Sequence, residues 1–427
     1  MKSLFTFACL FFGVIGTVPA QRICGTTDYK QALLRSNPSL NSIFQNIEKQ
    51  IEAITHPANT RAMRDTTSNE IIHIPVVIHV LYKNDVENIS DAQIQSQLDI
   101  LNNDYNLLNA DRANTPQPFK SIAGNARIQF CLARVDPRGR KTSGIERKYT
   151  SENYFTTDDG MKMVATGGTA AWDSKHYLNI WICKLSSRTL GYATPPGAAA
   201  DMDGVVIAYD AFGTAGNLRP LFNKGRTATH EIGHWLGLIH VWGDNDCGDD
   251  LVNDTPTQSA YNFGCSTFPK LSKCSPNSNG DMFMNFMDFS DDACMNIFTI
   301  GQVRRMRALF AQNNLRNAFL ASFACDSILA TADPLTLTGA VSRPAISVDP
   351  IRVYPSPVQY SATIECKTAT ALTPKTMDLF NSVGMKVFTQ KLLQEKTVLN
   401  LSVLVTGIYI VRIGEGGEKF TTRIIKQ

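Results

Sequence analysis

The chain has 427 residues, which is more than one ordinary domain holds, and 43% of them are hydrophobic and 19% charged. This composition is typical of packed globular domains and excludes a largely disordered protein. The formal net charge of +3 is small for this length and no lysine or arginine run is present, so nothing here indicates nucleic-acid binding.

Residues 1–20 are predicted to be a signal peptide. Lys2 supplies the positive charge, residues 4–18 form an apolar stretch too short to span a bilayer comfortably, and Val18 and Ala20 are the small residues before a cleavage site. A buried helix is the alternative interpretation. No other stretch approaches 18 continuous apolar residues, so no transmembrane segment is predicted for the mature chain. Export would let cysteines pair, and nine of the ten remain once Cys9 is removed.

Two segments of different character follow. Residues 21–65 are polar and helix-prone around "SLNSIFQNIEKQIEAI" and end in "HPANTRAMRDTTSN", which is predicted to be exposed and cleavable. Residues 66–326 hold all four tryptophans, and the stretch "IIHIPVVIHVLY" at 71–82 is predicted to be a central strand. Ile94, Leu98, Leu101 and Tyr105 then show helical periodicity. Further strands are predicted in "YLNIWICKL" and "GVVIAYDAF".

Three of the seven histidines lie within the eleven residues "HEIGHWLGLIH". His230 and His234 are about 40° apart on an α-helix, so they face the same way and could bind one metal ion. A continuing helix would turn His240 about 240° away from His234. Gly237 can end the helix and let the chain bring His240 back. Three neutral imidazoles leave a fourth position for water, as in a catalytic zinc site, and Glu231 could take a proton from that water.

The alternative is a buried amphipathic helix with incidental histidines. Five specified positions at about 5% each would match by chance in roughly one chain in several thousand of this length. The pattern therefore favours a zinc site.

The motif HExxHxxGxxH resembles the zinc signature of the metzincin metallopeptidases. "NFMDF" supplies a methionine, Met287, that corresponds to their Met-turn beneath the zinc. "GHWLGLIHVWG", "NDTPTQ", "NFMDF" and "CMNIFTIGQ" together are most similar to the pappalysin family, and the resemblance covers roughly residues 22–311. It implies a secreted zinc endopeptidase of the α+β class, with the zinc in a cleft between two subdomains and Glu231 as the catalytic base. It also implies that residues 21–65 are a propeptide and 66–326 the catalytic domain.

One position departs from the family pattern. Its members commonly carry tyrosine two residues after the Met-turn methionine, and Phe289 stands here instead. Loss of one donor to the transition state typically costs about 10²–10³ in rate, so either another donor compensates or this enzyme is slower than its relatives.

The acidic stretch "GDNDCGDDLVNDTP" is either a solvated loop or a calcium site, because hard cations take carboxylate and carbonyl oxygens. The family resemblance implies calcium ligands at Asp250 by its side chain and at Asn253 and Thr255 by their backbone carbonyls.

The family resemblance also implies two disulfides in this region, Cys247–Cys274 and Cys265–Cys294, which would stabilise a loop-rich subdomain. A second zinc site at these cysteines is disfavoured by their wide, irregular spacing. Cys131 and Cys183 lie in apolar strands and are predicted to be buried thiols. Cys325 and Cys366 have no predicted partner.

Cys24, in "QRICGT", is far from the other cysteines. One interpretation is a disulfide. The other is a thiolate on the open position of the zinc, which would displace water and keep the precursor inactive. Gly25 would let the backbone pass through the cleft, and Arg22 could pair with Glu231 or with a pocket acid. This arrangement resembles the cysteine switch of pappalysin zymogens.

Several pappalysins cleave before arginine with an acidic S1′ pocket. Asp291 and Asp292 follow the Met-turn, so the resemblance implies a preference for arginine at P1′ and places these acids near the pocket. The same preference nominates the Thr60–Arg61 and Met63–Arg64 bonds for self-processing.

Residues 327–347 are predicted to be a linker and residues 348–427 a small β-sandwich. "VYPSPVQYSATIEC", "TVLNLSVLVTGIYIVRI" and "EKFTTRIIKQ" resemble the C-terminal sorting domain of Bacteroidetes type IX secretion substrates, with Ser356 in place of the usual asparagine. The resemblance implies recognition by that secretion machinery, passage through the periplasm, and then release or attachment at the cell surface. An adhesive or carbohydrate-binding module is the alternative for this tail.

Two functions remain open for the whole chain. The first is a secreted zinc endopeptidase that acts on proteins or peptides as a monomer. The second is a surface adhesion protein with a structural metal site. A structural site has no need of a carboxylate beside its ligands, so Glu231 favours the peptidase.

Overall fold

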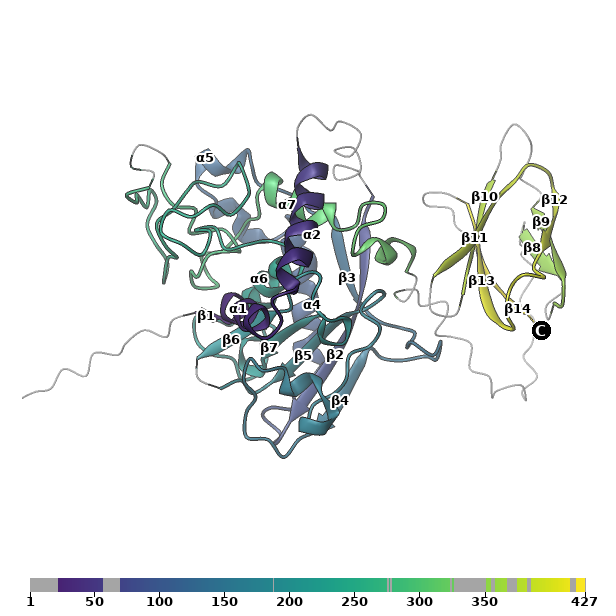
Figure 1. Ribbon diagram of the computed structural model, residues 1–427, viewed down its shortest axis with the longest axis horizontal. Coiled ribbons are helices and arrows are strands. Elements are labelled where there is room, and N and C mark those ends of the chain that lie inside the picture. Colours follow the sequence, from purple (N-terminus) through teal and green to yellow (C-terminus); the bar gives the residue numbers. More distant parts are fainter. Residues whose placement is uncertain are drawn as a thin grey trace, which may run out of the picture.

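The computed structural model (Figure 1) describes residues 22–56, 70–186, 188–274, 276, 279–322, 325, 351–354, 358–366, 375–381, 385–414 and 420–426. The predicted signal peptide, the linker 327–347 and both nominated processing bonds lie outside these residues. Among the described residues, no helix is long and apolar enough to cross a membrane.

A seven-stranded sheet forms the centre of the N-terminal body (Figure 1), with strand order β1-β6-β7-β5-β2-β3 and β4 paired to β2. Its strands are β1 (Ile23–Cys24), β2 (Ile72–Tyr82), β3 (Ile128–Leu132), β4 (Ile145–Tyr149), β5 (Leu178–Cys183), β6 (Thr189–Ala193) and β7 (Val205–Ala208). Strand β2 pairs in parallel with β3 along its first half, with β4 along its second half, and with β5 on its other edge. The apolar run at 71–82 is therefore the central strand that the sequence predicted. Strand β6 pairs antiparallel with β7, so β6 and the edge strand β1 run against the other described strands of this sheet.

The helices of this body are α1 (Thr26–Ser36), α2 (Leu40–Thr55), α4 (Asp91–Tyr105), α5 (Gln117–Lys120), α6 (Arg226–Trp235) and α7 (Ile300–Ala308). Short 3-10 turns lie at η1 (Ala110–Asn114), η2 (Gly160–Lys162), η3 (Val164–Thr166), η4 (Ala200–Met202), η5 (Tyr209–Ala211) and η6 (Asn317–Ala321). The periodic apolar positions of α4 are all buried, which confirms the predicted helix. Between α6 and α7 the described residues form turns, bends and isolated bridges rather than helices or strands.

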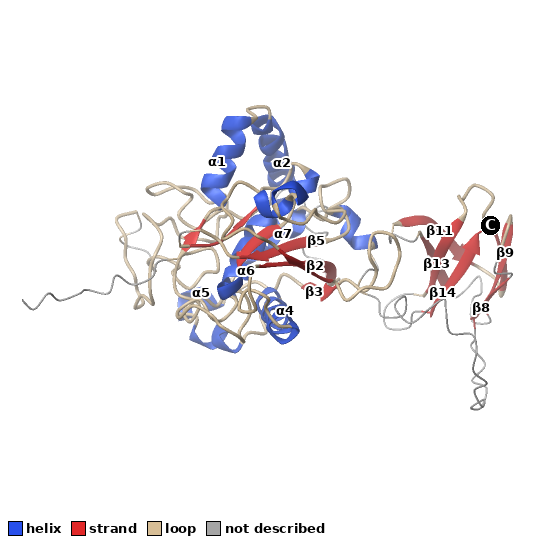
Figure 2. Ribbon diagram, turned by 90° about the horizontal axis from the view of Figure 1, so that it is seen from below, coloured by secondary structure: helices blue, strands red, loops and turns tan. Residues whose placement is uncertain are grey.

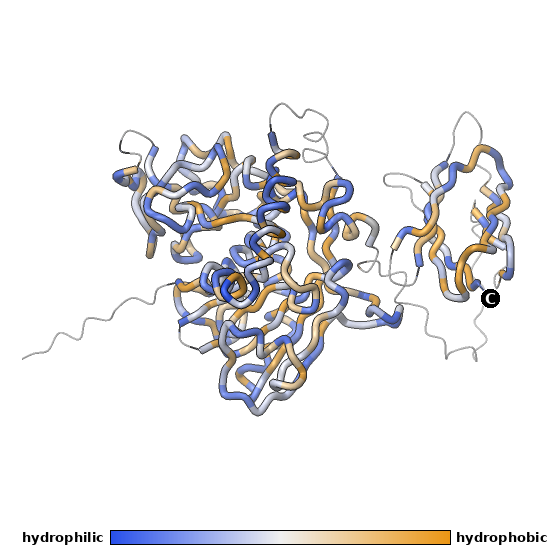
Figure 3. Tube along the Cα trace, viewed as in Figure 1, coloured by the Kyte–Doolittle hydropathy of each residue, from blue (hydrophilic) through white to orange (hydrophobic). Residues whose placement is uncertain are grey.

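Apolar side chains cover both faces of the sheet. Figure 3 shows hydrophobic (orange) stretches of chain in the centre of this body. The larger cluster joins the sheet to α4, α6 and α7, and includes Ile78, Ile180, Ile232 and Met306. A second cluster, on the opposite face, includes Trp181, Tyr192 and Val206. The alternation along β5 and β7 explains this division, because successive side chains of a strand point to opposite faces.

The N-terminal segment is folded against this body. Strand β1 pairs in parallel with β6, and α1 and α2 form a helical hairpin that projects from the sheet (Figure 2). On α2, Ile51 is 2% exposed and belongs to the larger core cluster. The Glu48 carboxylate accepts two hydrogen bonds, of 2.6 and 2.8 Å, from the Arg305 guanidinium of α7. The predicted propeptide is thus part of the packed structure.

The C-terminal residues form a separate all-β unit with its own apolar core. One sheet has the order β11-β10-β13-β14 and the other β12-β9-β8. The strands are β8 (Ile351–Tyr354), β9 (Ser361–Cys366), β10 (Lys375–Phe380), β11 (Lys386–Leu392), β12 (Lys396–Asn400), β13 (Gly407–Ile413) and β14 (Phe420–Lys426). Two antiparallel sheets around one core agree with the predicted small β-sandwich.

One cysteine prediction is wrong. Cys131 forms a disulfide with Cys325, at a Cα–Cα distance of 5.7 Å and a sequence separation of 194 residues, instead of being a buried thiol. Strand β3 lies at an edge of the sheet and Cys131 is only partly buried there, so a segment from the end of the body can reach it. Cys183, in the interior strand β5, is a buried free thiol as predicted.

Candidate active site

Helix α6 carries the first two histidines of the motif, and all ten of its residues are buried. The end of α4 holds it in place. Asp104 accepts a 2.7 Å hydrogen bond from the Thr229 hydroxyl, and the Tyr105 hydroxyl donates to the Thr229 carbonyl at 2.9 Å. Arg226, at the first turn of α6, pairs with Asp111 at 3.0 Å. A buried helix fixed by charged and polar contacts can present side chains with little positional freedom.

The chain reverses after α6 in the way that Gly237 predicted. Gly237 has φ +84°, its amide donates to the His234 carbonyl at 2.9 Å, and the Leu238 amide donates to the Gly233 carbonyl at 3.0 Å. These bonds cap the helix with a left-handed residue. As a result, the Nε2 atoms of His240 and His234 are 3.0 Å apart, and those of His234 and His230 are 3.1 Å apart.

The opposite nitrogen of each of the three imidazoles has a hydrogen-bond partner outside the cluster. Nδ1 of His230 lies 2.7 Å from the Phe286 carbonyl, Nδ1 of His234 lies 2.9 Å from the Leu238 carbonyl, and Nδ1 of His240 lies 2.5 Å from an Asp244 oxygen. Acceptors at Nδ1 fix the proton there and leave three Nε2 lone pairs facing one point. Burial lowers the pKa of both His230 and His234, so both rings are neutral, as metal binding requires.

The sulfur of Cys24 completes this group. Ligand atoms of Cys24, His230, His234 and His240 all lie within 4.8 Å of one another, and all four residues are buried. Three imidazoles and one thiol suit a tetrahedral zinc ion. Burial, and then the charge of Glu231, raise the pKa of the Cys24 thiol well above its usual value. A cation at the same point would reverse this and favour the thiolate.

Glu231 lies beside the group and belongs to the same helix as His230. One carboxylate oxygen accepts a 2.8 Å hydrogen bond from the Thr26 hydroxyl and lies 3.4 Å from the Cys24 sulfur. Burial raises the pKa of Glu231 to about 7. The Ala193 amide of β6 donates to the same Thr26 hydroxyl at 2.9 Å. The role of Thr26 was missed by the sequence analysis, because one threonine two residues after a cysteine carries no signal.

Arg22 pairs with Asp292, and not with Glu231. The guanidinium binds the Asp292 carboxylate, donates to the Ser290 carbonyl at 3.2 Å, and lies over the Phe222 ring at 5.3 Å. The other oxygen of Asp292 accepts from the backbone amide of Lys224 at 2.8 Å. Asp292 is fully buried, whereas Asp291 is only partly buried. Of the two candidate pocket acids, Asp292 is the one that contacts a guanidinium.

The Met-turn residues lie under the histidines. A side-chain atom added at Gly233 would come within 2.5 Å of the Met287 sulfur, so the methionine packs directly on the helix. The ring of Phe289 lies 5.0 Å from that of His240, and Tyr261 stacks on Phe289 at 5.2 Å. The ring at position 289 thus has the packing role but no hydroxyl.

The predicted calcium residues lie in the loop after His240. The Asp250 carboxylate accepts from the Thr255 hydroxyl at 2.8 and 2.9 Å and from the Val252 amide at 3.1 Å, and burial raises its pKa to about 7. Asn253 is exposed in the same turn. Disulfides join Cys247 to Cys274 and Cys265 to Cys294, the pairs that the resemblance implied.

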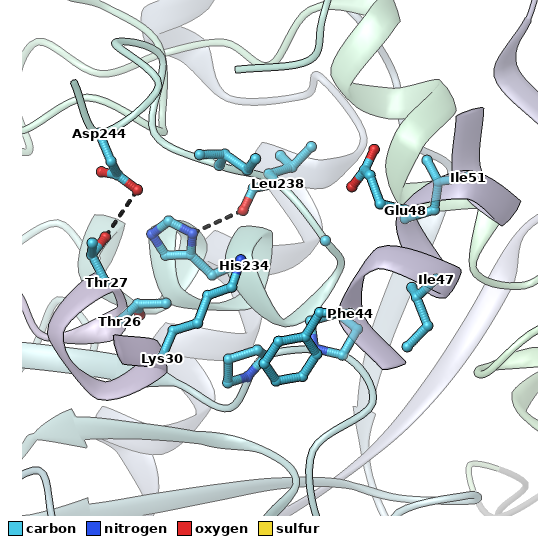
Figure 4. Close-up of a pocket in the computed structure, with 14 residues that line it drawn as sticks. Thr26, Thr27, Lys30, Phe44, Ile47, Glu48, Ile51, His234, Leu238 and Asp244 are labelled. Atoms are coloured by element: carbon cyan, nitrogen blue, oxygen red, sulfur yellow. Dashed lines mark hydrogen bonds between the residues drawn. The ribbon is translucent and has the colours of Figure 1, made fainter. Parts of the chain in front are cut away.

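A pocket lies between the helical hairpin and the end of α6 (Figure 4). Lys30, Phe44 and Glu48 line it from the hairpin, and His234 and Asp244 line it from the body. Asp244 accepts a 3.0 Å hydrogen bond from the Thr27 hydroxyl (Figure 4), so the carboxylate that orients His240 also holds α1. The motif alone did not reveal that Asp244 contacts both the third histidine and the N-terminal segment.

Two family profiles match the chain. The first, described as pregnancy-associated plasma protein-A (Peptidase_M43), matches residues 160–311, and the second, a secretion system C-terminal sorting domain, matches residues 352–427. An extracellular metalloprotease of Arthroderma otae is 33% identical over 269 residues, which cover 61% of this chain and 84% of the relative. An extracellular metalloprotease of Colletotrichum graminicola is 30% identical over 305 residues, 68% of this chain and 91% of the relative.

Two solved structures from Tannerella forsythia are similar. Mature mirolysin in complex with a cleaved peptide is 49% identical, with a TM-score of 0.59 over 60% of this chain and 97% of that chain. A promirolysin mutant is 45% identical, with a TM-score of 0.64 over 70% of this chain and 97% of that chain. The promirolysin match covers more of this chain and is the structure of a precursor.

Proposed function

Since the chain belongs to the pappalysin family of zinc metallopeptidases, we propose that His230, His234 and His240 hold its catalytic zinc and that Cys24 blocks the metal in the precursor. The protein is a secreted zinc metalloendopeptidase that acts on protein substrates. One observation carries the proposal: three imidazoles and one thiol converge on a single buried point beside a glutamate.

Zinc bound there would act as a Lewis acid that lowers the pKa of water and polarises a peptide carbonyl. The residues of the chain orient the metal ligands and transfer the proton. The outer hydrogen bonds of the histidines keep their lone pairs on the metal. The Glu231 carboxylate accepts a proton from the attacking water and passes it to the leaving amine.

The precursor would be latent because the N-terminal segment occupies three parts of the site at once. Cys24 takes the position of water, Thr26 donates its hydroxyl to Glu231, and Arg22 fills the pocket of Asp292. Cleavage at Thr60–Arg61 or Met63–Arg64, followed by dissociation of the segment, would free all three.

The decisive experiment measures cleavage of casein or gelatin by the zinc-loaded protein after its N-terminal segment has been removed. We expect cleavage that a chelator abolishes and zinc restores. Zinc binding without cleavage of any protein would favour the alternative function, a surface adhesion protein with a structural metal site.

We expect the enzyme to prefer substrates with arginine at P1′. The buried Asp292 carboxylate binds the guanidinium of Arg22 in the precursor, and a substrate arginine could take the same place. Asp292→Asn should lower the ratio of kcat/KM for arginine over leucine at P1′ by at least about tenfold, since a charged hydrogen-bonded pair is typically worth about 1.5–3 kcal/mol. The measurement is a peptide series that differs only at P1′.

Asp291→Asn is the matched control, and its arginine preference should remain within about twofold of wild type. An unchanged preference in Asp292→Asn would assign the pocket to other residues.

We also propose a calcium ion in the loop at Asp250, Asn253 and Thr255. A cation there would stabilise the Asp250 carboxylate, whose charged form is otherwise disfavoured by burial. Calcium at a hundred times its dissociation constant should raise the free energy of unfolding by about 2.7 kcal/mol. Thermal melting with calcium or with a chelator measures this.

Asp250→Asn should abolish the calcium effect, whereas Asp246→Asn, at an exposed carboxylate nearby, should retain it. An equal shift in both variants would place the ion elsewhere.

The C-terminal sorting domain marks the protein as a type IX secretion substrate of a Bacteroidetes bacterium. We propose that it crosses the periplasm on this route, is then released or attached to the cell surface, and acts as a monomer.

A further inference from the structure

The side chain of Tyr29, on the first turn of α1, is buried beside β6. The space that this side chain fills is here called the Tyr29 cavity, and removal of the N-terminal segment would vacate it. Tyr29 is 3% exposed, and its ring lies 4.9 Å from that of Tyr192. Its hydroxyl donates to the Asp159 carboxylate at 2.5 Å. The walls of this cavity belong to the second apolar cluster and include Phe155, Met161 and Trp181.

The polar end of this cavity is built from buried groups. Asp159 also accepts a 2.9 Å hydrogen bond from the Tyr192 hydroxyl and pairs with the Lys162 ammonium at 2.7 Å. Lys162 is 2% exposed, and its ammonium lies over the rings of Tyr29, Trp181 and Tyr192 at 5.0–5.3 Å. Lys162 balances the charge of Asp159, and the Tyr192 hydroxyl donates to one oxygen of that carboxylate. The other oxygen is therefore the one that accepts a hydrogen bond from the phenol of Tyr29 or of a substrate.

A short stretch of chain that lies along β6 joins the Tyr29 cavity to the reacting centre. From Cys24 the chain passes Gly25, whose amide donates to the Gly191 carbonyl of β6 at 2.9 Å and which lies against Thr157 and Tyr192. The Tyr29 amide then donates to the Gly25 carbonyl at 2.9 Å. Arg22 precedes Cys24 in the chain and enters the pocket of Asp292. Tyr29 follows Cys24 in the chain and enters the Tyr29 cavity.

We propose that the Tyr29 cavity is a substrate subsite on the non-primed side, which selects a tyrosine within the three residues before the scissile bond. This inference rests on the proposed function, in which the pocket of Asp292 is S1′ and the N-terminal segment leaves. Once it has left, a substrate phenol can take the place of Tyr29, with its ring between Tyr192 and Lys162 and its hydroxyl on Asp159.

The geometry discriminates between tyrosine and phenylalanine. Burial and the charge of Asp159 raise the pKa of the Tyr29 phenol, so the group is a hydrogen-bond donor at any physiological pH. A phenylalanine in its place would fill the apolar walls but leave a buried carboxylate oxygen without that donor, which costs affinity.

The test uses the full-length zinc-loaded protein, activated by proteolysis in residues 57–69 and separated from its N-terminal segment. Peptides of one parent sequence carry tyrosine, phenylalanine, O-methyltyrosine or alanine at P1, P2 or P3. At one of these positions we expect kcat/KM to be about tenfold higher for tyrosine than for phenylalanine or O-methyltyrosine. Ratios below twofold at all three positions would overturn the proposal, whereas failure to cleave any peptide would instead count against the proposed peptidase function.

Asp159→Asn should bring the ratio of kcat/KM for tyrosine over phenylalanine close to one. The matched control is Asp158→Asn, at the exposed neighbouring carboxylate, which should keep the wild-type ratio. A wild-type ratio in Asp159→Asn would overturn the assignment of the hydrogen bond. If Asp159→Asn fails to fold, which thermal melting would show, the peptide series on the unaltered enzyme still decides.

Discussion

Glu231→Ala is expected to lower the turnover of the activated enzyme by several orders of magnitude while zinc remains bound. The three imidazoles and their outer hydrogen bonds do not depend on this carboxylate, so the metal should stay. Asp244 also contacts the histidines, but it binds Nδ1 of His240, on the side of the ring opposite to the cluster of Nε2 atoms, so it is not placed to replace the base. The measurement pairs metal analysis of the purified variant with peptide cleavage rates.

Glu231→Gln keeps the shape and should be impaired to a similar degree, because an amide cannot accept the proton. Glu152→Ala, at an exposed carboxylate of the same body, is the control and should cleave at the wild-type rate. Residual activity within tenfold of wild type in Glu231→Ala would refute the role of general base, and loss of zinc would show that the residue supports the metal instead.

Cys24→Ala is expected to give a precursor that is active without cleavage or that matures much faster than wild type. The variant removes the only sulfur of the buried group, so water can reach the metal. Arg22 and Thr26 still hold the segment in the cleft, and for this reason we expect partial rather than complete loss of latency. The assay follows peptide cleavage and the size of the chain over time from the moment of zinc addition.

Cys183→Ala is the matched control, since Cys183 is also a buried free thiol but lies in β5 away from the histidines. It should be as latent as wild type. Latency that survives in Cys24→Ala, or a disulfide at Cys24 found by mass mapping, would reject the cysteine switch.

The features that could be predicted from sequence are those determined by residues that lie close together in the chain. The periodicity of α4, the apolar run of β2 and the helix break at Gly237 all arise from local conformational preferences and burial. The convergence of His230, His234 and His240 follows from the same local geometry. Such signals need no knowledge of the rest of the fold.

The residues that could not be predicted act through partners far away in the sequence. Thr26 and Tyr29 reach their partners only because β1 pairs with β6, which lies more than 160 residues further along the chain. The choice between Asp291 and Asp292 depends on which carboxylate is turned inward, and the backbone amide of Lys224 decides it. The disulfide at Cys131 was missed for the same reason, because an apolar strand pattern does not show that the strand lies at an exposed edge.

The contacts that hold α2 on the body affect how soon activity would appear after cleavage. A cut between His56 and Glu70 severs the covalent link, but Ile51 stays in the core and Glu48 stays on Arg305. The severed segment then becomes a tightly bound inhibitor rather than a departing fragment. Activity would lag behind cleavage and would depend on dilution, because the segment must dissociate and can rebind. An enzyme concentrated at the cell surface would therefore remain restrained after processing, and would reach full activity as the segment diffuses away or is degraded.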